Sequence, residues 1–371
     1  TALENSESGV EAGENEKLSA FDVHVEGVSA NNTKPMEIYI KEAAAVGLNS
    51  TSIKLHHVEN GQTTQMDPVD TFTAHNQFKY DPATGDMVLY MQSFSEVLFV
   101  AEDAKWEGGY DYSWYDASKT QLYIATADQL AGFSAIVGGM NGQTQDDFAG
   151  KTVTLVANID LNDLTDENSY VFYPIGYYNS TGSYNKVSGG SVTSDASSFE
   201  GTFDGNGYTI MNFYQNTWEM FGDYNDGYSG TPNHYKDAMG LFGYVYNGTV
   251  KNLTVKNFSS DGEFTPTGVI AAFSAGNATF ENIAIVDCNP RVYNTGNGGI
   301  IGIAGNYEDQ NTKITLKNIT VDNTNKITAL WGSWDVACGG LVGMFRGNTD
   351  GGNGKIHFEN CRVSAQIDVN N

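Results

Sequence analysis

The chain has 371 residues, a formal net charge of −26 at pH 7 and 40% hydrophobic residues. This acidity argues against nucleic acid and anionic membrane surfaces as partners, and the apolar content is sufficient for a sizeable core. No apolar run reaches the length of a transmembrane helix. The three cysteines (Cys288, Cys338 and Cys361) are too widely spaced to indicate a disulfide framework or a zinc site. We therefore expect no transmembrane segment, no metal and no cofactor.

The first hundred residues predict a tether followed by a small β domain. Residues 1–17 are polar, acidic and without aromatic residues, which predicts a disordered tether. No signal peptide precedes them, which indicates a cytosolic or an already processed chain. Residues 18–101 contain short alternating runs separated by turn signals, which predict an antiparallel β-sandwich of immunoglobulin-like type. The predicted strands are 21–25, 36–40, 53–57, 87–91 and 97–100.

A junction and one helix come next. Residues 102–118 form an aromatic linker that contains Trp106, Tyr112 and Trp114. We expect these rings to pack between the two domains, and a ligand platform is the alternative. Thr126 and Gln129 form a capping box, and the apolar residues from Leu130 to Val137 share one helical face. This amphipathic helix is placed to cover the open end of a repeat array.

The remainder of the chain repeats. Four Gly-apolar-apolar-Gly/Ala tetrads are each followed by an apolar-x-Asn-apolar-x-apolar run, and two weaker copies of the run lie upstream. Repeats with a constant core and variable insertions indicate a stacked array. The tetrads begin at Gly240, Gly268, Gly299 and Gly340, and the asparagines of the six runs are Asn158, Asn212, Asn252, Asn282, Asn318 and Asn360.

The spacing inside each run predicts the architecture. Side chains alternate faces along a strand, so two apolar residues three apart, such as Val250 and Leu253, cannot both face inward without a bend. Asparagine tolerates the left-handed conformation that such a bend needs. We therefore predict that residues 119–371 form a right-handed parallel β-helix, in which the six asparagines stack in one column with mostly buried amides. The outward residue before each asparagine alternates in sign along Lys251, Glu281, Lys317 and Glu359.

Aromatic residues outside the repeats mark the candidate ligand surface. They lie in a long insertion at 214–238 and in a shorter segment between the last two runs, and insertions in repeat proteins often form the binding face. Flat rings with polar tips suit stacking on sugar rings, with nearby carboxylates to bond hydroxyls. The alternative is that Trp218 folds back over the coils as a structural flap. The candidate ligand-binding residues are Trp218, Asp223, Tyr224, Asp226, Tyr228, Trp331 and Trp334.

No catalytic constellation emerges. Glycosidic cleavage needs a pair of suitably spaced carboxylates, and the columns that follow the asparagines contain no such pair. The acids cluster in insertions instead, and a solvated loop is the simplest reading of Asp160, Asp163, Asp166 and Glu167, with calcium binding as the alternative. The histidines are scattered, and no zinc-protease, nucleophile-elbow or P-loop motif is present.

The segment Phe199-Glu-Gly-Thr-Phe-Asp-Gly-Asn-Gly-Tyr-Thr-Ile210, together with Gly240-Leu-Phe-Gly243 and the run ending at Val255, resembles the GLUG-motif family of bacterial surface proteins. The resemblance covers about residues 120–365. It implies a β-helical extracellular region, often in lipoproteins of gut Bacteroidetes, with a role as an adhesin. It brings no catalytic residues with it.

These observations predict a noncatalytic protein of the extracellular or outer-membrane surface, with a possible lipid anchor before residue 1. Its expected partner is a glycan or a host or bacterial surface protein. The alternatives are a carbohydrate-active enzyme of the β-helix class, either a polysaccharide lyase or a glycoside hydrolase, and a purely structural stalk. Since no capping element follows the last run, we also expect the chain to continue beyond Asn371 or a neighbour to cover this end.

Overall fold

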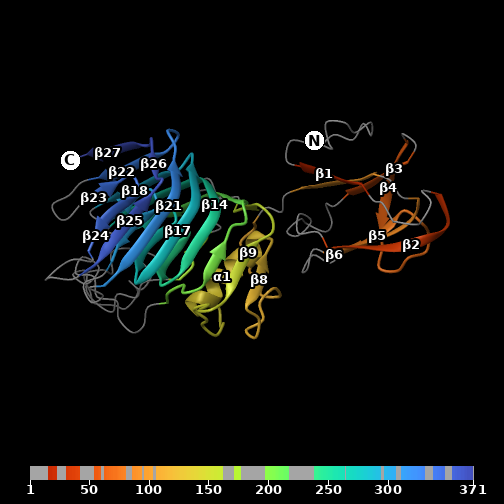
Figure 1. The fold of residues 1–371 in the computed structure, drawn as a ribbon, viewed down its shortest axis with the longest axis horizontal. Helices are drawn as coiled ribbons and strands as arrows, with labels where there is room; N and C mark the ends of the chain where they lie inside the picture. Colours follow the sequence, from red (N-terminus) through yellow and green to blue (C-terminus); the bar gives the residue numbers. More distant parts are fainter. Residues whose placement is uncertain are drawn as a thin grey trace. The chain divides into compact units, whose positions relative to one another are not determined.

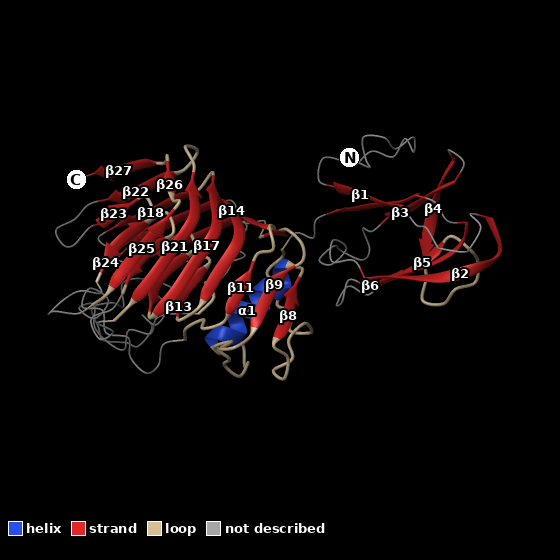
Figure 2. Ribbon diagram, viewed as in Figure 1, coloured by secondary structure: helices blue, strands red, loops and turns tan. Residues whose placement is uncertain are grey.

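The computed structural model describes residues 16–22, 31–41, 54–59, 62–80, 86–93, 96–102, 106–161, 171–176, 197–216, 238–263, 265–293, 296–305, 311–330, 337–346 and 353–370. Its contacts divide the chain into two compact units, one of residues 1–105 with Val156–Ile159 and one of the remaining residues. The described part is nearly all β and contains one helix (Figure 2). Within it, no helix is long and apolar enough to span a bilayer.

The first unit contains one seven-stranded sheet with the order β1-β7-β3-β4-β5-β6-β2 (Figure 1). All its strand pairs are antiparallel except the short pairing of β4 with β5. Three of the predicted strands lie inside β2, β6 and β7, and the polar strand β4 had no apolar alternation to reveal it. The strands are β1 (Glu16–Asp22), β2 (Asn31–Lys41), β3 (Lys54–Glu59), β4 (Gln62–Pro68), β5 (Gln77–Tyr80), β6 (Asp86–Ser93) and β7 (Glu96–Glu102).

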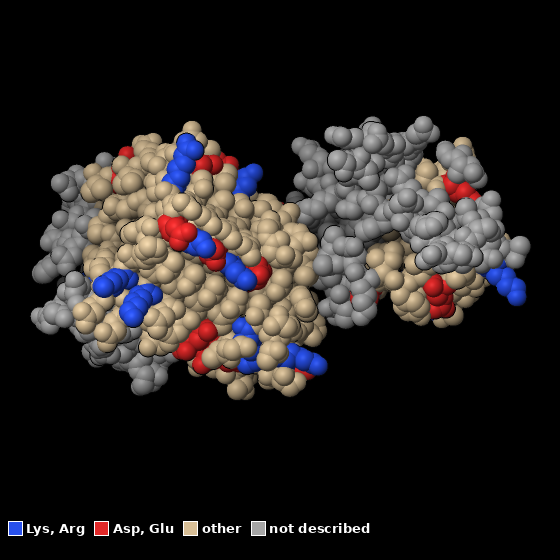
Figure 3. All heavy atoms as spheres, viewed as in Figure 1, with Lys and Arg blue, Asp and Glu red and all other residues tan. Residues whose placement is uncertain are grey.

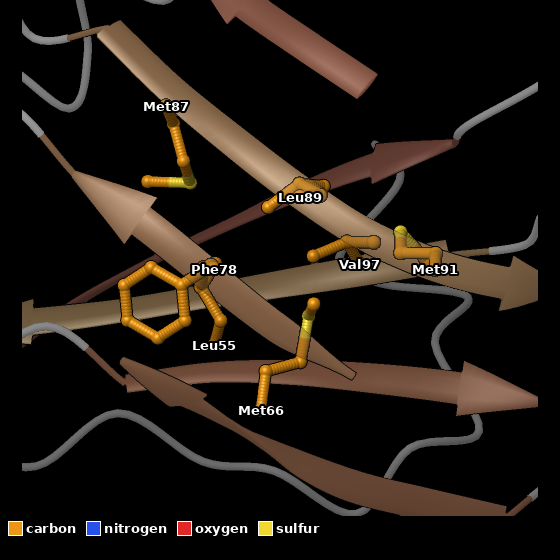
Figure 4. Close-up of a cluster of buried hydrophobic side chains, with 7 residues drawn as sticks. All are labelled: Leu55, Met66, Phe78, Met87, Leu89, Met91 and Val97. Carbon is orange, nitrogen blue, oxygen red and sulfur yellow. The ribbon is translucent and has the colours of Figure 1, made fainter. Parts of the chain in front are cut away.

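The core of this unit is built by strand alternation. In β6, Met87, Leu89 and Met91 are buried while the intervening residues are half-buried, so one face of the strand packs inward. Their side chains meet those of Leu55, Met66, Phe78 and Val97 from four other strands (Figure 4). Residues 1–15 of the expected tether lie outside the described residues. Its last two residues, Glu16 and Lys17, belong to β1.

In the described residues, the second unit contains three sheets, and the successive copies of the repeat pair with one another through parallel strands. Its elements are β8 (Gln121–Ile124), α1 (Ala127–Gly138), β9 (Thr152–Leu155), β10 (Ile159–Asp160), β11 (Thr202–Asp204), β12 (Thr209–Asn216), β13 (Phe242–Tyr246), β14 (Thr249–Glu263), β15 (Thr267–Gly268), β16 (Ala271–Ala275), β17 (Asn277–Val286), β18 (Asn289–Tyr293), β19 (Gly296–Gly298), β20 (Ile301–Ala304), β21 (Lys313–Val321), β22 (Lys326–Leu330), β23 (Ala337–Gly339), β24 (Val342–Phe345), β25 (Lys355–Glu359), β26 (Arg362–Val363) and β27 (Gln366–Asn370).

Each successive copy of the repeat returns to the same place one strand further along the sheets. One sheet has β13-β16-β20-β24 in order, a second has β15-β19-β23, and the largest contains β14, β17, β21 and β25 side by side. Val250, Phe280, Leu316 and Phe358 lie in register across these last four strands. This arrangement of parallel strands is compatible with a parallel β-helix, and each copy is called a coil below.

Glycine is required at the corner between the two smaller sheets. Gly268, Gly298 and Gly339 are aligned in neighbouring coils. A Cβ on any of them would collide with the backbone carbonyl oxygen three residues further along the chain. The chain therefore turns so tightly here that no side chain fits, which explains why glycine recurs at this point of every copy.

Helix α1 begins and ends where its caps predict. The Thr126 hydroxyl accepts the Gln129 amide at 3.1 Å, and Gly139 adopts a left-handed conformation after the last turn. All its residues except Asp128 are buried, so the helix is enclosed rather than exposed along one face. Phe133 lies within ring contact of Phe148, Phe199 and Phe203. Helix α1 lies at the end of the unit that contains β8, β9 and β11 (Figure 2).

The aromatic segment that was expected as a linker belongs to the second unit from Trp106 onward. Trp106 is 2% exposed and packs edge-on against Phe172, and Trp114 packs against Phe133 and Phe148. The rings therefore pack inside this unit and cover α1. The physical reason is that α1 needs a cover on its outer side, where Gly132 lies directly against the Asp111 carbonyl.

The aromatic cluster around α1 supplies the first prediction. Phe133→Ala removes a fully buried ring from contact with at least three others, and we expect it to lower the unfolding free energy by about 3–5 kcal/mol. Tyr123→Ala, at an aromatic residue that is 55% exposed in the neighbouring strand, should change it by less than about 0.5 kcal/mol. Urea unfolding followed by circular dichroism measures both. Equal losses for the two variants would contradict the packing described.

Candidate functional site

A column of asparagine amides links successive coils along the exposed surface of the largest sheet. Asn252, Asn282, Asn318 and Asn360 all adopt the left-handed conformation, with φ between 52° and 55°. Each side-chain amide donates to the side-chain oxygen of the preceding coil, at 2.8 Å from Asn282 to Asn252 and from Asn318 to Asn282, and at 3.2 Å from Asn360 to Asn318. The column begins at Asp204, whose carboxylate accepts from Asn252 at 2.9 Å. We call it the first ladder.

The left-handed asparagine changes which side chains of the run face inward, as the spacing of its apolar residues requires. Leu253 and Val255 are as buried as Val250, although they follow it at spacings of three and five residues. The expectation of buried amides is wrong, because Asn282, Asn318 and Asn360 are exposed and Asn252 is half-buried. The corner must bulge outward for both flanking strands to face the core, so its side chain lies at the surface.

The prediction of a single column of six asparagines is also wrong. Asn212 is aligned with Asn257, and it belongs to a second ladder in which Asn257 donates to Asn212 and Asn212 donates to Asp160, at 2.9 and 3.0 Å. Asn158 has no left-handed conformation, and Asp160 instead accepts the amide of the next coil. The signal for the second ladder was present, because Asn257 and Asp287 each follow a first-ladder asparagine by five residues and both have positive φ.

Charged side chains run alongside the first ladder. Lys251 pairs with Asp204 at 3.1 Å and Lys317 pairs with Glu281 at 3.0 Å, so in each case the lysine of one coil reaches the carboxylate of the preceding coil. Figure 3 shows acidic and basic side chains alternating across this face of the second unit. Burial alone would raise the pKa of Asp204, but hydrogen bonds from Asn252, the Asn206 backbone and Lys251 outweigh it, so the pKa lies below its usual value.

All seven predicted ligand-binding residues, from Trp218 to Trp334, lie outside the described residues. The strands that flank them are described. Residues 217–237 follow β12 and precede Met239, and residues 331–336 follow β22 and precede β23. The junction group of Trp106, Tyr112 and Trp114 belongs to the packing around α1.

The two aromatic insertions occupy the same turn of different coils, which we call the insertion turn. On its entry side, Asn216 pairs with Asp261, which pairs through β18 with Thr328 of β22. On its exit side, Met239 pairs with Thr267, which pairs through Asn297 with Cys338. The strands that carry the two insertions are three strand spacings apart, or about 14 Å.

The described residues contain no group of three or more His, Cys, Asp or Glu side chains placed to hold a metal ion. Of the acids considered for calcium, Asp160 accepts from Asn212, and Asp163, Asp166 and Glu167 lie outside the described residues. Burial raises the pKa of the Cys288 thiol to about 12 and that of Cys338 to about 11, so neither forms a nucleophilic thiolate at neutral pH.

No protein-family model matches the chain, and no curated protein matches it either. The chain is similar to a solved structure from Bacteroides ovatus that is provisionally described as an immunoglobulin A1 protease, with 19% sequence identity and a TM-score of 0.40. The match covers 68% of this chain and 63% of that one. This chain thus matches less than two thirds of the length of that protein.

The first ladder supplies the second prediction. Asn282→Ala removes two amide hydrogen bonds. It also puts alanine, whose side chain makes no hydrogen bond, at a residue with positive φ, so it should lower the unfolding free energy by about 1–3 kcal/mol. Asn282→Gly should cost less, because glycine adopts this conformation without strain. Urea unfolding of the two variants separates the cost of the lost hydrogen bonds from the cost of the strained backbone. If glycine is as costly as alanine, the left-handed corner is not what the asparagine provides.

Proposed function

We propose that this chain is a noncatalytic cell-surface protein that binds a glycan or a protein through the loops of the insertion turn. In this proposal the second unit is a right-handed parallel β-helix, the first is an immunoglobulin-like sandwich, and the protein belongs with the GLUG-motif adhesins of the extracellular or outer-membrane surface. A lipid anchor before residue 1 would hold it there. The observation that carries the proposal is the register that brings two aromatic insertions to one turn.

The lengths of the connections that different coils make at the insertion turn support a binding role over a purely structural one. Between the two aromatic insertions, three residues (264–266) link β14 to β15 and two (294–295) link β18 to β19, whereas the insertions at 217–237 and 331–336 have twenty-one and six residues. Short turns are sufficient for the chain to pass this corner, so folding does not require the added residues. Loops on a rigid scaffold commonly carry binding residues, and the added ones here include Trp218, Trp331 and Trp334.

The spacing of the insertions suits an extended ligand. Two aromatic groups anchored about 14 Å apart match an oligosaccharide of several rings or a protein epitope better than a single small molecule. Asp223 and Asp226 would bond hydroxyl groups beside the rings of Tyr224 and Tyr228. A glycan is therefore the first class of ligand to screen, and a surface protein is the second.

The test is a glycan-array screen of the intact protein, followed by binding measurements on the best glycan found. We expect Trp218→Ala and Trp334→Ala each to weaken binding at least about tenfold while the melting temperature stays within about 1 °C. Tyr39→Ala is the matched control, because Tyr39 is 72% exposed but lies in the first unit.

Two outcomes would contradict the proposal. A melting temperature lowered by several degrees with binding unchanged would mean that Trp218 is part of a structural flap. Release of new reducing ends from the bound glycan would mean that the chain is a carbohydrate-active enzyme.

A further inference from the structure

His57 is a titratable side chain buried in the first unit. It follows Leu55 by two residues in β3, so both side chains lie on the face of the strand that packs inward, where Leu55 belongs to the buried cluster (Figure 4). His57 is 2% exposed and is paired across the sheet with Thr64 of β4 and Val97 of β7. Neither of these two neighbours carries a charge that would stabilise a protonated imidazole.

One contact decides where the ring holds its proton. Nδ1 of His57 lies 3.0 Å from the side-chain carbonyl oxygen of Asn76. Because a carbonyl oxygen only accepts, the neutral ring donates from Nδ1, and a second proton would be taken up at Nε2. Burial lowers the pKa of His57, since a charged ring would lose its hydration, and the nearby His75 lowers it further; the Asn76 bond and Glu59 of the same strand oppose this without reversing it.

Asn76 is the last residue of the loop 69–76, which connects β4 to β5. Its φ of 58° is left-handed, and its backbone carbonyl accepts the Asp67 amide at 3.0 Å. The strands on either side of β3 are fixed by antiparallel pairing, whereas the residues of the loop belong to no strand. Of the elements that contact His57 in these pairings and in the Asn76 bond, the loop is therefore the one that moves at least cost when the ring needs water.

We propose that His57 and Asn76 form an acid-sensitive latch that holds the loop 69–76 closed at neutral pH and releases it in acid. The closed state keeps the ring uncharged, and the open state lets water reach it. Below about pH 6.5, the ordinary pKa of histidine, the open state binds more protons than the closed state. The closed state therefore loses stability as the pH falls, and the loop opens.

Opening would change the surface of the first unit. Phe72 lies in the loop, and its ring stacks on that of Tyr90 in β6, with the two centroids 4.9 Å apart. Lys79 Nζ lies 4.3 Å from the centroid of the Phe72 ring. An open loop takes Phe72 away and uncovers the Tyr90 ring, which is half-buried in the closed state. All these residues belong to the first unit, so the latch is independent of the insertion turn.

Hydrogen–deuterium exchange of the full chain, followed by mass spectrometry, measures the loop directly. The Thr73 and Ala74 amides donate to the Gln77 side chain at 2.7 and 3.0 Å, so peptides that cover residues 66–78 report its opening. After correction for the intrinsic exchange rate, we expect the loop to open about fivefold more often at about pH 5.5 than at about pH 7.5. One added proton allows a change of at most about tenfold per pH unit.

Three variants assign the effect. His57→Gln does not titrate and retains an amide that can donate to Asn76, so its loop should open equally often at both pH values. Asn76→Gly keeps the left-handed conformation and removes the accepting oxygen, so its loop should open more often already at neutral pH. His56→Gln is the matched control, because His56 lies on the opposite face of β3, and this variant should keep the acid response.

Two results would overturn the proposal. One is equal opening of the loop at both pH values in the unaltered chain, and the other is an acid response in His57→Gln as large as that of the unaltered chain. If His57→Gln does not fold, a nuclear magnetic resonance titration of the unaltered chain decides. A His57 ring that titrates below the ordinary value of about 6.5 supports the latch, and one that titrates at that value overturns it.

Discussion

The structure of the second unit depends on one backbone conformation, the left-handed asparagine at the corner of each coil. It lets two strands that meet at a bend both turn their apolar side chains inward, as Leu253 and Val255 do after Asn252. The same residue then extends its amide to the coil before it, at 2.8–3.2 Å in the three asparagine–asparagine contacts. A single side chain thus sets both the shape of a coil and its register on the next, because an amide is at once donor and acceptor.

Register explains the other features of the molecule. Since the coils cannot slide past one another without breaking the ladder, lysines stay beside carboxylates of the preceding coil, and the turns that carry insertions stay above one another. An array of repeats has outermost coils, whose apolar interior needs a cover. At one end the chain provides its own cover, in the form of α1 beneath the aromatic segment that includes Trp106 and Trp114. In the last described coil, Phe358 and Val363 are 49% and 39% exposed.

The sequence revealed the parts of the structure that repeat and missed those that do not. The four later asparagines could be found because their coils share one pattern, and α1 because its caps are local signals. Asn212 was assigned to the wrong ladder because two coils have a second left-handed corner five residues after the first, at Asn257 and Asp287, and the sequence pattern around Asn212 fits either corner. The packing of Trp106 depends on Phe172, far along the chain, which no local pattern encodes. Within the candidate site, the sequence marks the aromatic residues, and only the pairing of β12, β14, β18 and β22 shows that their insertions share a turn.

The most direct test of this account is a double-mutant cycle between neighbouring members of the first ladder. Asn282→Gly and Asn318→Gly keep the left-handed corner available and remove the amides that meet at 2.8 Å. Urea unfolding of the two single variants and the double variant should give a coupling energy of about 0.5–1.5 kcal/mol. The pair Asn252 and Asn318, one coil further apart, should be additive within about 0.5 kcal/mol. Equal coupling in both pairs, or none in either, would contradict the claim that the amides tie each coil to the next.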